Sequence, residues 1–211
     1  MSAWSKAVHP AQTWFRKKRA ERILKRFPEI NGGVVIDVGG SLTFWKSVGD
    51  ILKPARVIIY NISAGRMQMG LQNRTDYIET HIYDGHTIPE ADGTADVVIC
   101  NSVIEHVPLE NRARLVSEIA RVGKRFVVQT PAYGFPLELH FGLPFIHWLP
   151  RSWGRLLVRA SPFALMSDAS SVWMFDQTQL LRKPEFKRYF PDADMEVEYF
   201  LGMPKSVLVF G

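Results

Sequence analysis

The sequence has little of what marks a secreted or membrane-spanning protein. Its 211 residues contain a single cysteine, Cys100, so no disulfide can form within the chain, and the apolar run 97–100 around it predicts a buried thiol. No run approaches the roughly 18 consecutive apolar residues of a membrane span, and no secretory-type apolar stretch stands near the N-terminus. We expect a cytoplasmic protein, with peripheral contact at the inner face of a membrane as the open alternative.

Net positive charge is lacking outside the first 31 residues. These carry eight Lys and Arg against two Glu, a net +6, while the whole chain has +5 and the other 180 residues therefore −1. A nucleic-acid-binding chain would be expected to carry basic side chains over the body of its domain as well, so we expect no nucleic-acid partner. The length and the 46% hydrophobic content suit one globular domain over residues 1–211.

The basic segment 1–31 has the spacing of an amphipathic helix. In residues 11–27, Trp14, Ile23, Leu24 and Phe27 recur at three- and four-residue intervals, which predicts one apolar face. We interpret this helix as a cap on the main domain. The alternative is that its basic face attaches to an anionic membrane surface or an acidic partner.

Short apolar runs then alternate with helical stretches, which is typical of strands buried on both faces of a parallel sheet. A helix between the last two runs begins after Pro108 and ends at Gly123. Near the C-terminus, the runs 195–200 and 206–210 are joined by a segment too short for a helix, so they should form an antiparallel hairpin. The predicted parallel strands are 34–37, 56–61, 77–82, 95–101 and 125–130.

A glycine turn follows the first of these strands. Asp37 ends the strand, Gly39 and Gly40 allow a ligand to approach the backbone, and a helix is expected through about Leu52. The dinucleotide fingerprint would need glycines where Ser41 and Phe44 stand, so a nicotinamide oxidoreductase is the disfavoured rival.

Two more segments have a matching spacing: Asp84-Gly85 after the third strand, and Asn101-Ser102 at the end of the fourth. With the glycine turn, residues 33–130 resemble the class I S-adenosylmethionine-dependent methyltransferases, type 11. The resemblance implies a Rossmann-like, doubly wound α/β fold, with a mostly parallel seven-stranded sheet and a C-terminal antiparallel hairpin. It implies S-adenosylmethionine as cofactor, bound by Asp37, Gly39, Gly40, Ser41, Asn61, Ile62, Asp84, Gly85, Asn101 and Ser102.

The chain departs from the family pattern at two of these positions. Asn61 stands where the family has an acid that accepts both ribose hydroxyls, and Ser41 stands where it has a second glycine. An amide oxygen still accepts hydrogen bonds but without the strength of a charge. A noncatalytic binding or scaffold protein on the same fold is therefore the alternative to an enzyme.

Methyl transfer to a hydroxyl or amine also needs a base, and ligands of open α/β sheets lie beyond the carboxyl ends of the strands. His140, after the fifth strand, is the first candidate, followed by His106, Tyr133 and Glu138. A metal site of Glu138, His140 and His147 would need a companion cluster, so no metal is expected.

The segment 131–175 is rich in aromatic residues, including Phe163, and we interpret it as a lid over the acceptor pocket. Its mixture of aromatics and arginines is typical of interfacial helices, so we expect a small or lipid-linked acceptor and peripheral membrane contact as a further alternative. A C-terminal helix and the hairpin complete the domain over residues 176–211.

Overall fold

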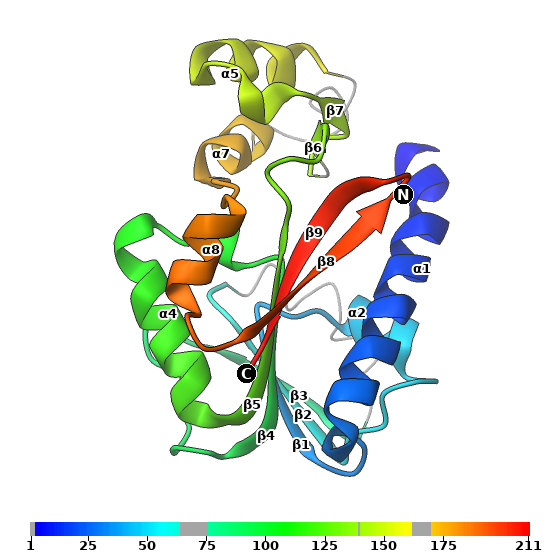
Figure 1. The fold of residues 1–211 in the computed structure, drawn as a ribbon, viewed down its shortest axis with the longest axis vertical. Helices are drawn as coiled ribbons and strands as arrows, with labels where there is room; N and C mark the ends of the chain where they lie inside the picture. Colours follow the sequence, from blue (N-terminus) through cyan, green and yellow to red (C-terminus); the bar gives the residue numbers. More distant parts are fainter. Residues whose placement is uncertain (1–2, 64–75, 139, 162–169) are drawn as a thin grey trace. The chain divides into compact units, whose positions relative to one another are not determined.

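The computed structural model describes residues 3–63, 76–138, 140–161 and 170–211. Its main feature is a seven-stranded sheet with the order β3-β2-β1-β4-β5-β9-β8 (Figure 1). β1 pairs in parallel with β2 and β4, and β2 with β3, which confirms the predicted Rossmann-like fold. The strands are β1 (Val34–Val38), β2 (Arg56–Asn61), β3 (Ile78–Ile82), β4 (Ala95–Asn101), β5 (Gly123–Pro131), β8 (Asp194–Phe200) and β9 (Met203–Phe210).

The chain divides into two compact units. The first contains residues 1–101, 113–128 and 210–211, and the second contains residues 102–112 and 129–209. β5 and β9 each contribute residues to both units. The units are described separately below.

In the first unit, α1 (Ala3–Arg26) packs beside α2 (Leu42–Val48) and is followed by η1 (Pro28–Ile30). The predicted apolar face was wrong at Trp14, which is 54% exposed, whereas the neighbouring Phe15 is buried. The buried row runs through Phe15, Arg19, Ile23 and Phe27, because side chains four residues apart stack on one helix face. Nowhere in the described ranges is a helix both long and apolar enough to cross a bilayer.

α4 (Leu109–Val122) confirms the predicted crossover helix. It begins directly after Pro108, and its residues Ile119 and Val122 are fully buried. Gly123 then starts β5 without a helical cap between them. A Cβ at Gly123 would lie 2.6 Å from Val98 Cγ2, so only glycine lets the chain pass β4 this closely.

The second unit carries the predicted aromatic segment, of which residues 162–169, including Phe163, lie outside the described residues. Its helices and short strands gather around a core of Phe141, Ile146, Val158 and Phe175 (Figure 1). Ile146, Val158 and Phe175 lie on η4, α5 and α7, so these three elements pack together through buried side chains. The elements are η3 (Ile104–His106), β6 (Leu137–Glu138), β7 (Leu143–Pro144), η4 (Ile146–Trp148), α5 (Arg151–Ala160), α7 (Ser170–Gln177) and α8 (Lys183–Tyr189).

The C-terminal hairpin is present, but its turn is shorter than predicted. β8 and β9 are joined by Leu201 and Gly202 alone, which have φ values of 50° and 78°. Positive φ at both positions is the backbone of a tight hairpin turn that follows the twist of the strands. Phe126 and Gly211 exchange both backbone hydrogen bonds, at 2.8 and 3.1 Å, as residues of an antiparallel β5–β9 ladder do.

Candidate functional site

In the first unit, the carboxylate of Asp37 at the end of β1 is enclosed. The residue is 1% exposed, and its Oδ2 accepts a 2.8 Å hydrogen bond from the indole nitrogen of Trp45 on α2. Its Oδ1 is buried without a hydrogen-bond partner in the described structure. Burial raises the pKa of Asp37 to about 7, although the hydrogen bond from Trp45 opposes the shift.

The glycine turn is built around this carboxylate. Gly39 has a φ of 69° and donates its backbone N–H to Tyr60 O at 2.7 Å. A Cβ at Gly40 would lie 1.9 Å from Asp37 Oδ2, so the second glycine makes room for the chain's own side chain. Asn61 Nδ2 donates to Gly40 O at 3.1 Å, which an aspartate at position 61 could not do. This bond gives a structural reason for the departure from the family pattern at position 61.

Ser41, the other departure, caps α2. Its extended backbone and its Oγ, which accepts a 3.3 Å hydrogen bond from Phe44 N, are those of an N-cap residue. The serine therefore has a local role where the family has a glycine.

The predicted residues beyond β2 and β3 meet at Gly85, where a Cβ would lie 3.0 Å from Ile62 Cγ2. Asp84 is exposed, and its Oδ1 accepts 2.8 Å hydrogen bonds from the backbone nitrogens of His86 and Thr87. These two bonds lower the pKa of Asp84. Asp84 thus shapes a turn, and its contact with a cofactor stays a prediction.

At the end of β4, Asn101 receives a residue that the sequence interpretation missed. Arg19 of α1 is only 6% exposed and donates from Nη1 to Asn101 Oδ1 at 2.7 Å. In the sequence, Arg19 is one of eight basic residues in segment 1–31, and only its place in the four-residue row with Phe15 and Ile23 distinguishes it.

Ser102, the first residue of the second unit, has a left-handed φ of 55°. Its backbone N–H donates to the backbone oxygen of Gln129 at 2.9 Å, and its Oγ donates to Gln129 Oε1 at 3.0 Å. These two bonds hold a conformation that serine rarely adopts, and such positions are frequent at functional sites.

The second unit brings three of the four predicted catalytic residues together. His106 Nε2 and His140 Nε2 lie 3.2 Å apart. His140 Nδ1 lies 2.7 Å from Glu138 Oε1, and His106 Nδ1 lies 3.2 Å from Thr178 Oγ1. Each imidazole is therefore held from behind by an oxygen, and both turn Nε2 towards the same point.

Glu105 belongs to the same cluster. It is 0% exposed, its Oε1 lies 4.0 Å from His140 Nε2, and its Oε2 accepts a 3.0 Å hydrogen bond from Thr130 Oγ1. Its Oε1 is buried without a hydrogen-bond partner in the described structure, and burial raises the pKa of this carboxyl group. In the sequence, Glu105 reads as a loop residue before Pro108, so its burial carried no local signal.

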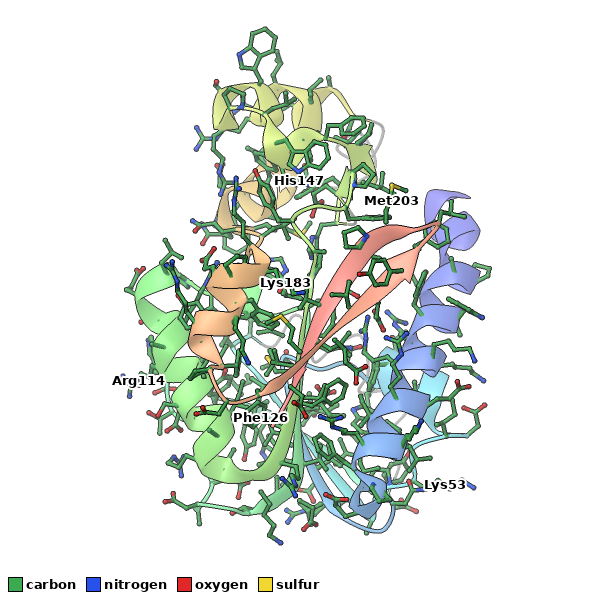
Figure 2. All side chains as sticks on the ribbon, in the orientation of Figure 1. Lys53, Arg114, Phe126, His147, Lys183 and Met203 are labelled. Carbon is green, nitrogen blue, oxygen red and sulfur yellow. The ribbon has the colours of Figure 1, made fainter. Side chains whose placement is uncertain are left out.

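Tyr133 lies in a different contact. Its carbonyl oxygen accepts hydrogen bonds of 3.0 and 2.9 Å from His147 Nε2 and Trp148 Nε1, and its ring lies 4.5 Å below the guanidinium of Arg182. Burial lowers the pKa of His147, which is the middle residue of η4 (Figure 2). His147 Nε2 thus lies against a backbone oxygen, apart from the contact between Glu138 and His140.

A cavity of about 390 Å³ lies in the second unit. Glu138 and Thr178, which hold the two imidazoles, form part of its wall, while Phe141, Ile146 and Phe175 give it an apolar side. This size and mixed lining suit a small organic molecule or the head of a larger one.

Comparison with known proteins gives the fold of the chain and a family match for part of it. Residues 38–126 match the sequence profile of the methyltransferase domain family, type 11. No curated protein sequence matches the chain. A solved S-adenosylmethionine-dependent methyltransferase from Mesorhizobium loti is 16% identical, with a TM-score of 0.59 over 90% of this chain and 96% of that one.

Two further solved structures have the same fold. Magnesium protoporphyrin IX methyltransferase from Synechocystis, with bound S-adenosylhomocysteine, has a TM-score of 0.59 at 14% identity, over 100% of this chain and 87% of that one. Geranyl diphosphate C-methyltransferase from Streptomyces coelicolor has a TM-score of 0.56 at 14% identity, over 92% and 76%. Residues 38–126 thus resemble the type 11 methyltransferase domain, and the chain has the fold of these solved methyltransferases.

Proposed function

We propose that the chain methylates an amphiphilic acceptor, small or lipid-linked, whose polar end occupies the cavity of the second unit. S-adenosylmethionine, when bound, supplies a methyl group on a positively charged sulfur. The work of the protein is then to bind, orient and exclude water.

The residues at the ends of β1 and β2 fit such a cofactor. Asp37 Oδ1 is a buried acceptor that lacks a hydrogen-bond partner, an arrangement that costs about 1–3 kcal/mol and that a donor group of a ligand would relieve. Asn61 uses its Nδ2 on Gly40 O, so its Oδ1 is free of that bond and suited to accept from a ribose hydroxyl. Gly39, Ile62, Gly85 and Asn101 remain the predicted neighbours of the cofactor.

One observation carries the choice of acceptor: α5 exposes an apolar face. Trp153, Leu156 and Leu157 are 64%, 62% and 42% exposed, although their i, i+3, i+4 spacing is that of a face normally buried. Gly154 and Val158 bury the opposite face. Leu149 is also exposed and at the same time lines the cavity, so the apolar surface continues into the pocket wall. Porphyrin and geranyl diphosphate, named for proteins of this fold, are acceptors of comparable character.

His140 remains the first candidate for the base that takes a proton from the acceptor. Because Glu138 occupies its Nδ1, Nε2 is the nitrogen on which a proton would be received. Both oxygens of Glu138 are already engaged, by the His140 ring and by the backbone nitrogens of His140 and Phe141. Glu138 is therefore a positioning residue, whereas the contacts of Tyr133 are with His147, Trp148 and Arg182.

Calorimetry with S-adenosylhomocysteine tests the cofactor part. We expect one molecule to bind per chain and Asn61→Ala to weaken binding about tenfold, since one hydrogen bond contributes about 1 kcal/mol or more. The control is His81→Gln, an exposed substitution on β3. Heat from neither S-adenosylmethionine nor S-adenosylhomocysteine would favour the noncatalytic scaffold.

Label transfer tests the acceptor part. The chain is incubated with S-adenosylmethionine carrying a radioactive methyl group and with a total lipid extract in detergent micelles. We expect label in the organic phase, at a rate reduced by Trp153→Ser with Leu156→Ser at unchanged affinity for S-adenosylhomocysteine. Label found only in water-soluble products of a cell extract would contradict a lipid-linked acceptor.

A further inference from the structure

Three possible metal-ligand atoms converge in the second unit. Glu105 and His106 lie on η3, and His140 follows β6; one ligand atom from each lies within 4.8 Å of the others. We propose that Glu105, His106 and His140 bind one divalent transition-metal ion.

The hydrogen bonds behind the rings fix both tautomers. Thr178 Oγ1 donates its only proton to Met174 O at 2.8 Å, so towards His106 it accepts, and His106 Nδ1 is the donor. Glu138 accepts two backbone N–H groups on Oε2 and, as a carboxylate, accepts His140 Nδ1–H on Oε1. With both Nδ1 atoms protonated, neutral rings direct two Nε2 lone pairs at each other across 3.2 Å.

Two lone pairs at this distance repel each other unless a cation lies between them. Metal–nitrogen bonds of about 2.0–2.1 Å place two adjacent imidazole nitrogens roughly 3.0–3.4 Å apart, which brackets the 3.2 Å observed. The rival arrangement is one extra proton shared between His106 and His140. Both arrangements use Glu105 as the balancing charge, so measurement has to separate them.

Glu105 supplies the independent observation. Its side chain is 0% exposed, and its Oε1 has no hydrogen-bond partner in the described structure while pointing to within 4.0 Å of His140 Nε2. A buried carboxylate oxygen is strongly disfavoured without a partner or a metal. A divalent ion also neutralises the site, because the two carboxylates of Glu105 and Glu138 then balance its charge.

The donor set selects the class of ion. Two imidazoles and one carboxylate suit zinc, iron, cobalt or manganese in the divalent state, whereas magnesium and calcium prefer oxygen ligands. The outer hydrogen bonds from Glu138 and Thr178 are those that commonly orient metal-binding histidines. Three protein ligands leave coordination positions open for another molecule, as in catalytic rather than structural sites.

The site adjoins the cavity, since Glu138 and Thr178 belong to its wall. The next step rests on the proposed function. A metal ion beside this cavity would bind an oxygen at the polar end of the acceptor, such as that of a hydroxyl, carboxylate or phosphate. A metal-bound His140 has no lone pair for a proton, so acidification of the bound oxygen would replace general-base catalysis.

Cobalt binding to the tag-free, chelator-treated full chain tests the proposal. We expect one Co²⁺ per chain, visible d–d absorption bands, and displacement of the bands by Zn²⁺. Glu105→Gln and His140→Ala should lose binding by more than 100-fold, and Thr178→Val by about 10- to 100-fold, as outer partners typically do. His81→Gln is the control with an exposed histidine.

Two outcomes overturn the proposal: no visible bands in the wild-type chain, which favours the shared proton, or bands unchanged in Glu105→Gln. Far-ultraviolet circular dichroism and S-adenosylhomocysteine calorimetry on each variant show whether it folds. A chain that binds S-adenosylhomocysteine without Co²⁺ refutes the metal site alone. A chain that binds Co²⁺ without S-adenosylhomocysteine refutes the proposed function and leaves the metal site standing.

Discussion

The buried carboxylate of Asp37 lowers the stability of the chain. Its carboxylate has one hydrogen bond, from Trp45, and one buried oxygen without a hydrogen-bond partner in the described structure. A well-packed apolar side chain would avoid the cost of this oxygen. Such a compromise is expected where a side chain has to meet a ligand that folding alone does not supply.

Asp37→Asn should make the chain more stable at high pH. The pKa of Asp37 is raised by burial to about 7 from an ordinary 3.8, so between these values the folded state binds more protons than the unfolded one. The contribution that the raised pKa of Asp37 makes to the free energy of unfolding is complete below about pH 4 and is lost as the pH rises through about 7. Because asparagine mimics the protonated acid, its stabilising effect should be roughly 2–3 kcal/mol larger at about pH 8 than at about pH 5.

Urea unfolding at the two pH values measures this difference. The same substitution should weaken S-adenosylhomocysteine binding if Asp37 Oδ1 accepts from the ligand. An equal effect on stability at both pH values would show that the carboxylate does not titrate in this range.

For single residues, the sequence predicted the place in the fold better than the contacts of the side chain. Asp37 and Asn61 lie at strand ends and Gly39 lies in the turn, as predicted, because strand ends and glycine turns leave local signals; their contacts with a cofactor stay a prediction. Glu105 was missed as a cluster member, since its burial depends on Thr130, which is remote in the sequence. Tertiary contacts of this kind leave no periodic trace in the sequence.

Among the elements, the C-terminal hairpin contains a residue in an unfavourable conformation. Leu201 has a φ of 50° and is 80% exposed, so it strains the backbone without packing in return. Leu201→Asn should stabilise the chain by about 0.5–1 kcal/mol, because asparagine tolerates this region and favours such turns. Leu201→Ala is the matched control, since alanine keeps the Cβ. Equal urea midpoints for the two variants would contradict the argument.

The contact between α5 and α7 gives a second prediction at this scale. A Cβ at Gly154 would lie 2.4 Å from Cζ of the buried Phe175, so Gly154→Ala should destabilise the chain by about 1–2 kcal/mol despite the higher helix propensity of alanine. Thermal unfolding measures the change. Adding Phe175→Leu should restore part of the loss if overlap is the cause, and a further drop of the same size as Phe175→Leu alone would argue against it.

Elements were predictable where apolar runs were continuous. β2 and β4 have the predicted bounds, since both faces of these strands are buried. The hairpin turn was predicted too long because Pro204 and Lys205 look like loop residues, yet both lie within β9. Edge and turn positions depend on pairing partners, which the local sequence does not specify.

At the scale of the whole molecule, part of the positive charge of the N-terminal helix is paired or buried within the chain. In α1, Lys17 pairs with Asp50 at 2.5 Å, Lys18 pairs with Glu21 at 2.9 Å, and Arg19 is buried. These contacts support the cap interpretation of the basic helix over attachment to an anionic surface. Exposed surface ion pairs are weak, however, so they lower the attraction to lipid without abolishing it.

The apolar face of α5, rather than the charge of α1, should therefore govern any contact with lipid. We expect the chain to float with liposomes of zwitterionic lipid as well as with anionic ones. Trp153→Ser with Leu156→Ser should lower the partition coefficient about 100-fold or more, since each of the two buried apolar side chains contributes about 1.5 kcal/mol. Lys17→Gln with Lys18→Gln is the matched pair and should change flotation little. The opposite result would be that the two lysine substitutions abolish flotation while the two α5 substitutions leave it intact. The basic helix would then be the membrane-binding element, and the acceptor would need no lipid anchor.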